Sequence, residues 1–369
     1  MKIRTRRHAL GPILLLIGWA FMAVSAAAAA EGTAAAEGTD AISKMDYEAG
    51  FYYTVKKGDT LWDLSQRFSD SPWQWPDLWR ENKQIPNPHW IYPGERIRIY
   101  RKSGQYAGEK PPASTAPTPD LKEVPPITPQ VEASTPVQRP KLEVEFFFPG
   151  IDRVGFIRKP VVQPLGVIFK CLRDKELISS GDTVYVRYGN AKTKSAFQPG
   201  ARMTVYRTID PNAKSVANES TGDQHYLVGV VEVASTEAEY AIAKVVESYR
   251  AIFINDKLMP YETRSPNIPV VDATPGIKGK IIVAEEHQLL MGDHMFAFID
   301  KGADDHILPG QIYNIYSQET AKIEGAGNTV LKPVQIGALI VLHVEKDNST
   351  AFIINSKDRI ASGNLVMTP

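Results

Sequence analysis

Residues that could carry out covalent chemistry are few in this sequence. Its single cysteine, Cys171, lies in the apolar run V-I-F-K-C-L, which indicates a buried small side chain rather than an activated thiol. A cysteine nucleophile needs a histidine partner, and no motif containing Gly and His surrounds Cys171. One cysteine also excludes an intrachain disulfide.

The seven histidines are scattered, without the H-x-H or H-E-x-x-H spacing typical of zinc hydrolases. The densest group, Asp304-Asp305-His306, precedes Ile-Leu-Pro-Gly and is interpreted as a solvated turn. We therefore expect no metal site and no cofactor.

Glu247-Ser248 is the pair that best fits carbohydrate chemistry. A glutamic acid protonates the glycosidic oxygen in glycoside hydrolysis, and lytic transglycosylases carry a similar Glu-Ser pair on a helix. Here the pair lies in the strand-like run Val245–Tyr249. We expect it to be structural and the protein not to be an enzyme, with a cell-wall hydrolase as the remaining alternative.

A compact α+β unit is predicted over Tyr53–Ile99. Tyr53 and Val55 alternate with polar residues, as in a half-buried strand. After a break at Gly58, either Asp59 or Thr60 can cap a helix. The sequence Thr60-x-x-Asp63 fits a capping box, and an apolar stripe follows at Leu61, Leu64 and Phe68.

The second half of this unit predicts another helix and a strand. Pro76 suits the first position of a helix because its missing N–H is no loss there. Pro93-Gly94 fits a type II turn, and Ile97 and Ile99 then share one face of the last strand. The predicted order is strand, helix, helix, strand.

The segments Y-T-V-K-K-G-D-T-L-W-D-L and N-P-H-W-I-Y-P-G-E-R-I-R-I closely resemble a LysM domain, the bacterial module that binds glycans containing N-acetylglucosamine, chiefly peptidoglycan. The resemblance covers about 47 residues. It departs from the shortest family members at Ser69–Trp75, which is longer and richer in tryptophan.

The resemblance implies a shallow glycan-binding groove between two loops. The implied site residues are Gly58, Asp59, Thr60, Leu61, Ile85, Asn87, Pro88, His89, Trp90 and Ile91. The tryptophans of this region leave two interpretations open: most of them supply core or rim packing, whereas Trp73 and Trp90 lie on loops and could contact sugar. We interpret Asp59 as a helix-capping residue in preference to a residue that contacts the ligand.

The amino terminus has the pattern of an export signal. A basic start with Lys2, Arg4, Arg6 and Arg7 precedes an apolar run and small residues, so residues 1–30 are predicted to be a signal peptide. Removal of these residues takes away four of the 42 basic residues and none of the 42 acidic ones. The remaining chain has a formal charge of −4. We expect no nucleic-acid partner, and membrane association only if this leader is uncleaved.

The rest of the chain divides by composition. Residues 31–50 are predicted to be disordered, 51–101 to form the LysM domain, and 102–143 to be a linker. Nine prolines lie between positions 103 and 143. At about 3.1 Å per residue such a segment reaches on the order of 120 Å, so we interpret it as a tether.

Beyond the linker, short runs rich in Val, Ile, Tyr and Phe predict a mostly β region. Matching segments recur at offsets of 108 to 111 residues, as in Pro199-Gly200 with Pro309-Gly310, and Gly229 with Gly337. Gly181-Asp182 likewise matches Gly292-Asp293. We predict two repeated barrels or sandwiches, at 144–262 and 277–369, joined by a connector at 263–276.

These features predict a multidomain, non-catalytic peptidoglycan-binding protein of the cell envelope. It is expected to be periplasmic or secreted, to associate with the cell wall, and to tether the two β domains there. The alternative is an envelope assembly or scaffold protein, whose β domains at 144–369 dock a protein partner.

Overall fold

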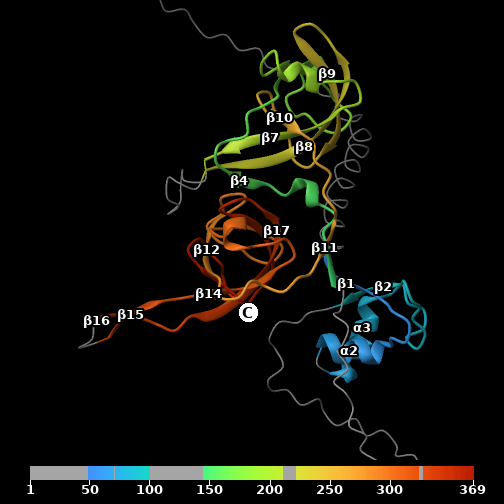
Figure 1. Ribbon diagram of the computed structural model, residues 1–369, viewed down its shortest axis with the longest axis vertical. Helices are drawn as coiled ribbons and strands as arrows, with labels where there is room; N and C mark the ends of the chain where they lie inside the picture. Colours follow the sequence, from blue (N-terminus) through green and yellow to red (C-terminus); the bar gives the residue numbers. More distant parts are fainter. Residues whose placement is uncertain (1–48, 70, 100–143, 211–221, 324–326) are drawn as a thin grey trace, which may run out of the picture. The chain divides into compact units, whose positions relative to one another are not determined.

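The computed structural model describes residues 49–69, 71–99, 144–210, 222–323 and 327–369 (Figure 1). The predicted signal peptide, the predicted linker and all but the last two residues of the predicted disordered stretch lie outside these ranges. Helices are few in the described part, and strands dominate it, as predicted.

The amino-terminal module has the predicted order of strand, helix, helix and strand. Its elements are β1 (Gly50–Thr54), α2 (Leu61–Ser69), the short 3-10 helix η1 (Pro72–Gln74), α3 (Trp75–Glu81) and β2 (Arg96–Ile99). Strands β1 and β2 are antiparallel, with Tyr53 opposite Ile97. Both of these side chains are buried, so the alternation in the sequence identified the inward face correctly.

Two further strands extend this sheet. Strands β3 (Val144–Phe147) and β11 (Asn267–Pro269) join it in the order β11-β3-β1-β2. Tyr53 is paired with Ile97 on one side and with Val144 on the other. Strand β2 precedes the predicted linker and β3 follows it, and both pair with β1. Strand β11 lies within the predicted connector at 263–276.

The first repeat forms a barrel. Its sheet runs β4-β8-β7-β10-β5-β6-β9, and an additional β8–β9 pairing closes six of the seven strands into a ring, with β4 outside on β8. We call this six-stranded ring barrel A. The strands are β4 (Phe156–Arg158), β5 (Gly166–Cys171), β6 (Thr183–Tyr188), β7 (Arg202–Ile209), β8 (Asp223–Thr236), β9 (Tyr240–Ser248) and β10 (Lys257–Pro260).

The second repeat, barrel B, is closed in the order β12-β13-β18-β17-β14-β19. If the six strands of each ring are numbered in chain order, neighbouring strands follow each other around both rings in the order 1-2-5-4-3-6. The strands of barrel B are β12 (Lys278–Ala284), β13 (Phe296–Ile299), β14 (Ile312–Ser317), β17 (Val334–Val344), β18 (Ser349–Ser356) and β19 (Leu365–Met367). Strands β15 (Thr320–Ile323) and β16 (Gly327–Val330) form a separate two-stranded arm (Figure 1).

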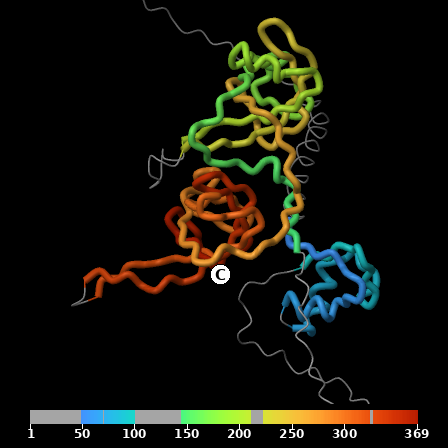
Figure 2. The backbone as a smooth tube through the Cα atoms, in the orientation of Figure 1, coloured from blue at the N-terminus to red at the C-terminus, as the bar shows by residue number. Residues whose placement is uncertain are grey.

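The strand registers show that the two barrels are repeats of one design. Gly229 pairs with Ser248, and Gly337 pairs with Ser356, at the offset of 108 found in the sequence. Irregularities in the β8–β9 pairing recur at the same offset in β17–β18. Figure 2 follows the chain through both barrels, from green to yellow and then from orange to red. Each barrel encloses its own apolar core.

One of the predicted matches was displaced by two residues. The Gly181 N–H donates to the Val245 carbonyl, and the equivalent N–H in barrel B belongs to His294, which donates to Ile353. Gly181 and His294 share a positive φ, of 90° and 65°, whereas Gly292 is not among the glycines with positive φ. The match to Gly292 was wrong because the first two strands are offset by 113 residues rather than 111.

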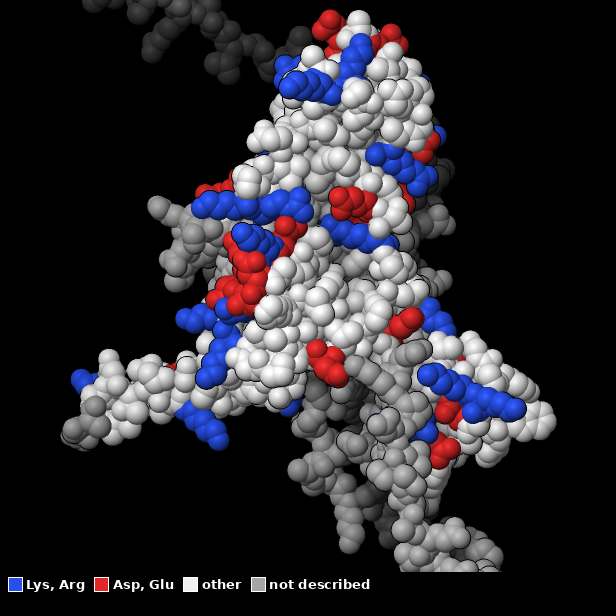
Figure 3. Space-filling model, in the orientation of Figure 1, with Lys and Arg blue, Asp and Glu red and all other residues white. Residues whose placement is uncertain are grey.

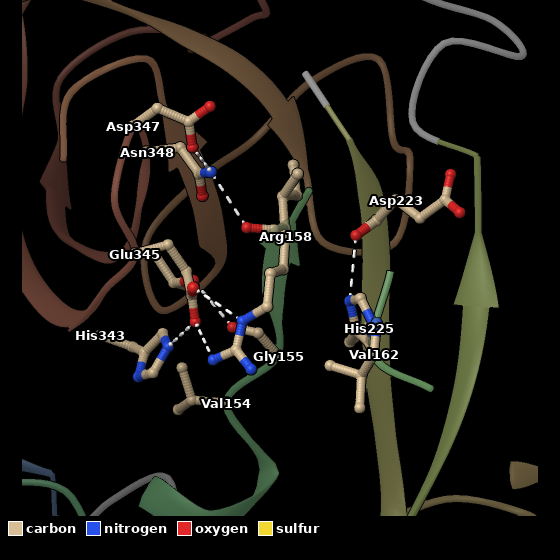
Figure 4. Close-up of polar contacts among 12 residues, drawn as sticks. Val154, Gly155, Arg158, Val162, Asp223, His225, His343, Glu345, Asp347 and Asn348 are labelled. Atoms are coloured by element: carbon tan, nitrogen blue, oxygen red, sulfur yellow. Dashed lines mark hydrogen bonds and ion pairs between the residues drawn. The ribbon is translucent and has the colours of Figure 1, made fainter. Parts of the chain in front are cut away.

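An ionic contact joins the segment around β4 to barrel B (Figure 4). The Arg158 guanidinium donates to both carboxylate oxygens of Glu345, at 2.8 and 2.7 Å, and the His343 ring lies 2.8 Å from the same carboxylate. The Asn348 amide donates to the Ile157 carbonyl at 3.0 Å. Thr350 also donates, to the Gly155 carbonyl.

A second ion pair lies deeper in the same interface. Glu285 follows β12, is 3% exposed, and accepts a hydrogen bond at 2.8 Å from Arg250 of barrel A. Gln224 donates to the Glu285 carbonyl at 2.7 Å, and Tyr226 donates to Glu286 at 3.0 Å. Barrel B therefore contacts the start of β8 through the turn that follows its first strand.

Candidate functional site

The loop between β1 and α2 is shaped by a glycine and a capping residue. Gly58 has φ of +96°, a backbone conformation that side chains with a Cβ rarely adopt. The Thr60 hydroxyl accepts the Asp63 N–H at 3.1 Å and donates to the Asp63 carboxylate at 2.8 Å. Thr60 is therefore the cap of α2, and the Asp63 carboxylate binds the Thr60 hydroxyl rather than the Thr60 backbone N–H that a full capping box uses.

The Asp59 carboxylate is fully engaged within the protein. It accepts the Tyr53 hydroxyl at 2.8 Å, the Lys56 N–H at 2.8 Å and the Arg67 guanidinium at 3.3 Å. Its side chain is only 8% exposed. Asp59 therefore fixes the shape of the loop, and it presents no free carboxylate to a ligand.

The loop between α3 and β2 is anchored by two buried contacts. Asn82 is fully buried, and it donates to the Leu78 and Arg98 carbonyls and accepts the Arg98 N–H. The Trp79 indole donates to the Ile85 carbonyl at 2.8 Å. These bonds tie the end of α3 to the strand that follows, so the loop starts from a fixed point.

The outer part of this second loop is an Asn turn. The Asn87 side chain accepts the His89 N–H at 3.0 Å, and the Asn87 carbonyl accepts the Trp90 N–H at 3.1 Å. This turn directs His89 and Trp90 outward, and Trp90 is 64% exposed. An exposed indole offers a large rigid apolar surface at little entropic cost.

Backbone hydrogen bonds hold the two loops beside each other. Val55 donates to the Glu95 carbonyl at 2.8 Å, and Gly94 donates to the Val55 carbonyl at 2.9 Å. Leu61, Ile85 and Ile91 belong to one apolar cluster beneath the loops. The two loops therefore combine exposed polar groups with apolar side chains, and an amino sugar offers an acetamido methyl and an amide to such a set.

The ten predicted site residues differ in what they can offer a ligand. Leu61 and Ile85 are each 2% exposed and belong to the buried apolar cluster of the module. Gly58, Thr60, Asn87, His89 and Trp90 are exposed, and Asp59, Pro88 and Ile91 are half-buried. The exposed members come from both loops.

Other aromatic side chains near the loops were missed or assigned differently from the sequence. Tyr92 was not predicted and is 59% exposed. Trp62 is 41% and Trp73 is 76% exposed, and their rings pack edge to face with centroids 4.8 Å apart. Trp75 and Trp79 are half-buried against the core. The signal for Tyr92 was its position immediately before the Pro93-Gly94 turn.

The residues considered for catalysis lie in strands of barrel A. Cys171 is 2% exposed, and burial raises the pKa of its thiol. Glu247 lies on β9, as its sequence context predicted, and accepts the Tyr249 hydroxyl at 2.9 Å. Within the described ranges, no three His, Cys, Asp or Glu side chains are grouped as metal ligands would be.

Surface charge is mixed on the face drawn in Figure 3, where Lys and Arg side chains lie among Asp and Glu. This distribution agrees with the balance of 42 basic and 42 acidic residues. In the part of the chain that the structure describes, no helix has the length and apolar character needed to span a membrane.

Comparison with known proteins identifies the amino-terminal module. Residues 53–99 match the family model of the LysM domain. An uncharacterized protein of Bacillus subtilis (strain 168), YqbP, is 44% identical over 57 residues, which cover 13% of this chain and 26% of that relative. The chain thus spans about a quarter of the relative's length, and the similarity does not extend through the β barrels.

Proposed function

We propose, from the LysM domain at residues 53–99, that this protein is a non-catalytic component of the bacterial cell envelope. The domain binds N-acetylglucosamine-containing strands of peptidoglycan and holds the two β barrels at the wall. LysM domains in general bind peptidoglycan or chitin-type glycans. The family match carries this proposal.

The geometry of the two loops supports the proposal. Both loops carry exposed groups, and Leu61 and Ile85 of the same loops belong to the module's apolar core. Trp90 supplies the largest exposed apolar surface of the predicted site, and backbone groups around Asn87 are positioned by its side chain. A sugar ring can stack on the first and hydrogen-bond near the second.

The pairing of β3 with β1 refines how the barrels would be held. Strand β3 belongs to the sheet of the LysM module. We therefore propose that the barrels are held directly beside the module, and not at the distance that an extended linker over residues 102–143 would span. The proposed location is periplasmic or secreted and wall-associated. LysM domains typically occur in extracellular or wall-associated proteins.

Binding of the full-length protein to purified sacculi tests this proposal. A single module is expected to bind in the micromolar range, about 8 kcal/mol. Trp90→Ala should weaken co-sedimentation by about tenfold, or about 1.4 kcal/mol. Leu289→Ala is the matched control, because Leu289 is 82% exposed but lies outside the LysM module, between β12 and β13.

The control should sediment with sacculi as well as the wild type does, and both variants should keep the wild-type melting temperature. Undiminished binding by Trp90→Ala would contradict the assignment of this loop to glycan recognition. Release of soluble glycan fragments during incubation would contradict a non-catalytic function.

A further inference from the structure

Two tryptophans outside the ten predicted site residues form an exposed pair on the LysM module. Trp62 lies in the first turn of α2, and Trp73 lies in η1. Their rings pack edge to face, with centroids 4.8 Å apart and planes at 77°. Trp62 is 41% exposed, and Trp73, at 76%, is the most exposed aromatic side chain within the described ranges. Most of the Trp73 indole therefore meets water rather than the core of the module.

Hydrogen bonds at the start of η1 hold Trp73 in place. Ser65 is fully buried on α2, and its hydroxyl donates to the Ser71 carbonyl at 2.8 Å. Pro72 is the first residue of η1, and the Gln74 N–H donates to the same Ser71 carbonyl at 3.2 Å. The short helix that carries Trp73 is thus bound to α2. A side chain that is ordered in this way before binding loses little entropy when a ligand covers it.

The pair is connected to both loops of the predicted glycan site. On one side, Trp62 directly follows Leu61 of the first loop. On the other side, Trp75 is the first residue of α3, and its ring centroid lies 6.2 Å from that of His89 in the second loop. Trp75 also packs against the apolar cluster that contains Leu61. A series of aromatic side chains therefore leads from η1 to the loops.

The exposed Trp73 ring suits a sugar in shape and in chemistry. The face of an indole is flat and carries negative partial charge, so it attracts the C–H groups of a pyranose ring. Because the two rings meet at 77° and not in parallel, Trp62 supports Trp73 without stacking on it. Gln66 is exposed and lies one turn after Trp62 on α2. Its amide is available for hydrogen bonds to sugar hydroxyls beside the pair.

The glycan that we propose as the ligand is a polymer, so it extends beyond the two loops. Sugar units that leave the loops either enter water or contact the protein beside the site. Such a contact costs little additional entropy, because the strand is already held by its other units. Trp73 combines a large exposed ring with a connection to both loops, and it is therefore suited to receive one of these units.

We infer that Trp73, supported by Trp62, forms a further subsite for an N-acetylglucosamine unit beyond those held by the two loops. This inference rests on the proposed function and specifies its ligand: the module binds long stretches of glycan more tightly than short fragments. A fragment that fills only the loops does not reach Trp73. Loss of the Trp73 ring therefore weakens the binding of long glycans and spares that of short ones.

Two other roles for the pair explain less. Packing alone is served by a smaller apolar side chain, and it does not account for an indole that stays 76% exposed. A protein partner on this surface would leave glycan binding independent of Trp73 at every glycan length. Both alternatives give different results in the experiment below.

Calorimetric titration of the full-length protein with linear N-acetylglucosamine oligomers tests the inference, with a trimer as the short ligand and a hexamer as the long one. Trp73→Ala should weaken hexamer binding about tenfold and change trimer binding by less than about twofold. Trp90→Ala should weaken the binding of both oligomers, because Trp90 belongs to the second loop. Trp73→Tyr keeps an aromatic ring and should retain most of the hexamer affinity. Leu289→Ala, outside the module, should change neither affinity.

The outcomes separate this inference from the proposed function. Hexamer binding that Trp73→Ala leaves unchanged and Trp90→Ala weakens would overturn the subsite and leave the proposed function standing. Equal losses for both oligomers in Trp73→Ala would put Trp73 among the groups that bind short fragments, and would also overturn a further subsite. A wild type that binds neither oligomer would overturn the inference, and sedimentation with sacculi then decides whether the proposed function falls with it. Trp73→Leu, which keeps apolar volume without a flat ring, replaces Trp73→Ala if that variant has a lowered melting temperature.

Discussion

Glu345 provides the sharpest test of how the two barrels are joined. Its carboxylate accepts two hydrogen bonds from Arg158 and lies against His343, and its side chain is 11% exposed. Glu345→Gln keeps the shape of the side chain but removes the charge. The Arg158 guanidinium then loses its carboxylate partner, which destabilises the folded chain.

The size of the effect follows from the carboxyl group's pKa. Burial alone would raise this pKa, but the hydrogen bonds from His343 and Arg158 outweigh burial and lower it from 4.5 to about 2. This difference corresponds to about 3 kcal/mol. The Arg158 side chain is 41% exposed, and solvent screens part of the interaction. We therefore expect Glu345→Gln to lower the free energy of unfolding by about 2 kcal/mol.

The repeat supplies the control, because Glu237 holds the equivalent position in barrel A and is exposed. Glu237→Gln should change the free energy of unfolding by less than about 0.5 kcal/mol. Urea unfolding of both variants at pH 7, followed by circular dichroism, makes the comparison. Equal effects of the two substitutions would refute the reasoning from the interface.

The same variant has a defined pH dependence. A carboxyl group whose pKa is lowered by folding stabilises the protein fully above its ordinary pKa of 4.5. That contribution is lost as the pH falls from 4.5 toward 2. The difference in stability between wild type and Glu345→Gln should therefore shrink over this range.

Two further predictions follow from buried positions. Burial lowers the pKa of His225 from 6.5 to about 4, and its Nε2 accepts the Val162 N–H at 3.1 Å. Because the unfolded chain takes up the proton first, wild-type stability should fall between pH 6.5 and 4, and urea unfolding of His225→Gln should show a smaller fall. Gly229→Ala and Gly337→Ala would place a Cβ 2.4 Å and 2.6 Å from strand carbonyl oxygens, and thermal unfolding should show each costing about 2 kcal/mol. Gly276→Ala, whose Cβ would meet nothing within 4 Å, should cost only the strain of its left-handed backbone, about 1 kcal/mol.

The sequence predicted the LysM module well because its signals are local. Thr60 caps α2 through a residue three positions away, and the strand alternation around Tyr53 depends on neighbouring residues. The same local signals could not show that the Asp59 carboxylate is enclosed by Tyr53, Lys56 and Arg67. Asp59 therefore has a structural role that the sequence did not reveal, and its place in the glycan-binding site stays a prediction.

The barrels were predicted less completely because their registers depend on pairs far apart in the chain. Matches at offsets of 108 and 110 residues were located correctly, since glycines mark both turns and close backbone contacts. The match at Gly181 was displaced because His294 adopts a positive φ without being glycine. Closure into a ring by β8–β9 pairing, and the addition of β3 to β1, have no local signature in the sequence.

The repeated architecture also explains why function is to be sought at outward positions. Both barrels keep the same strand order and the same irregularities, so their cores perform the same structural task. The outward surfaces of the barrels have diverged: Phe298 and Asn348 are buried against the segment around Ile157, whereas their equivalents in barrel A, Tyr185 and Tyr240, remain partly exposed. A duplication needs only one such contact within the chain. Where barrel B buries Val283 against the segment around Ile157, barrel A carries the exposed Lys170 at the equivalent position, as expected of a surface that meets water.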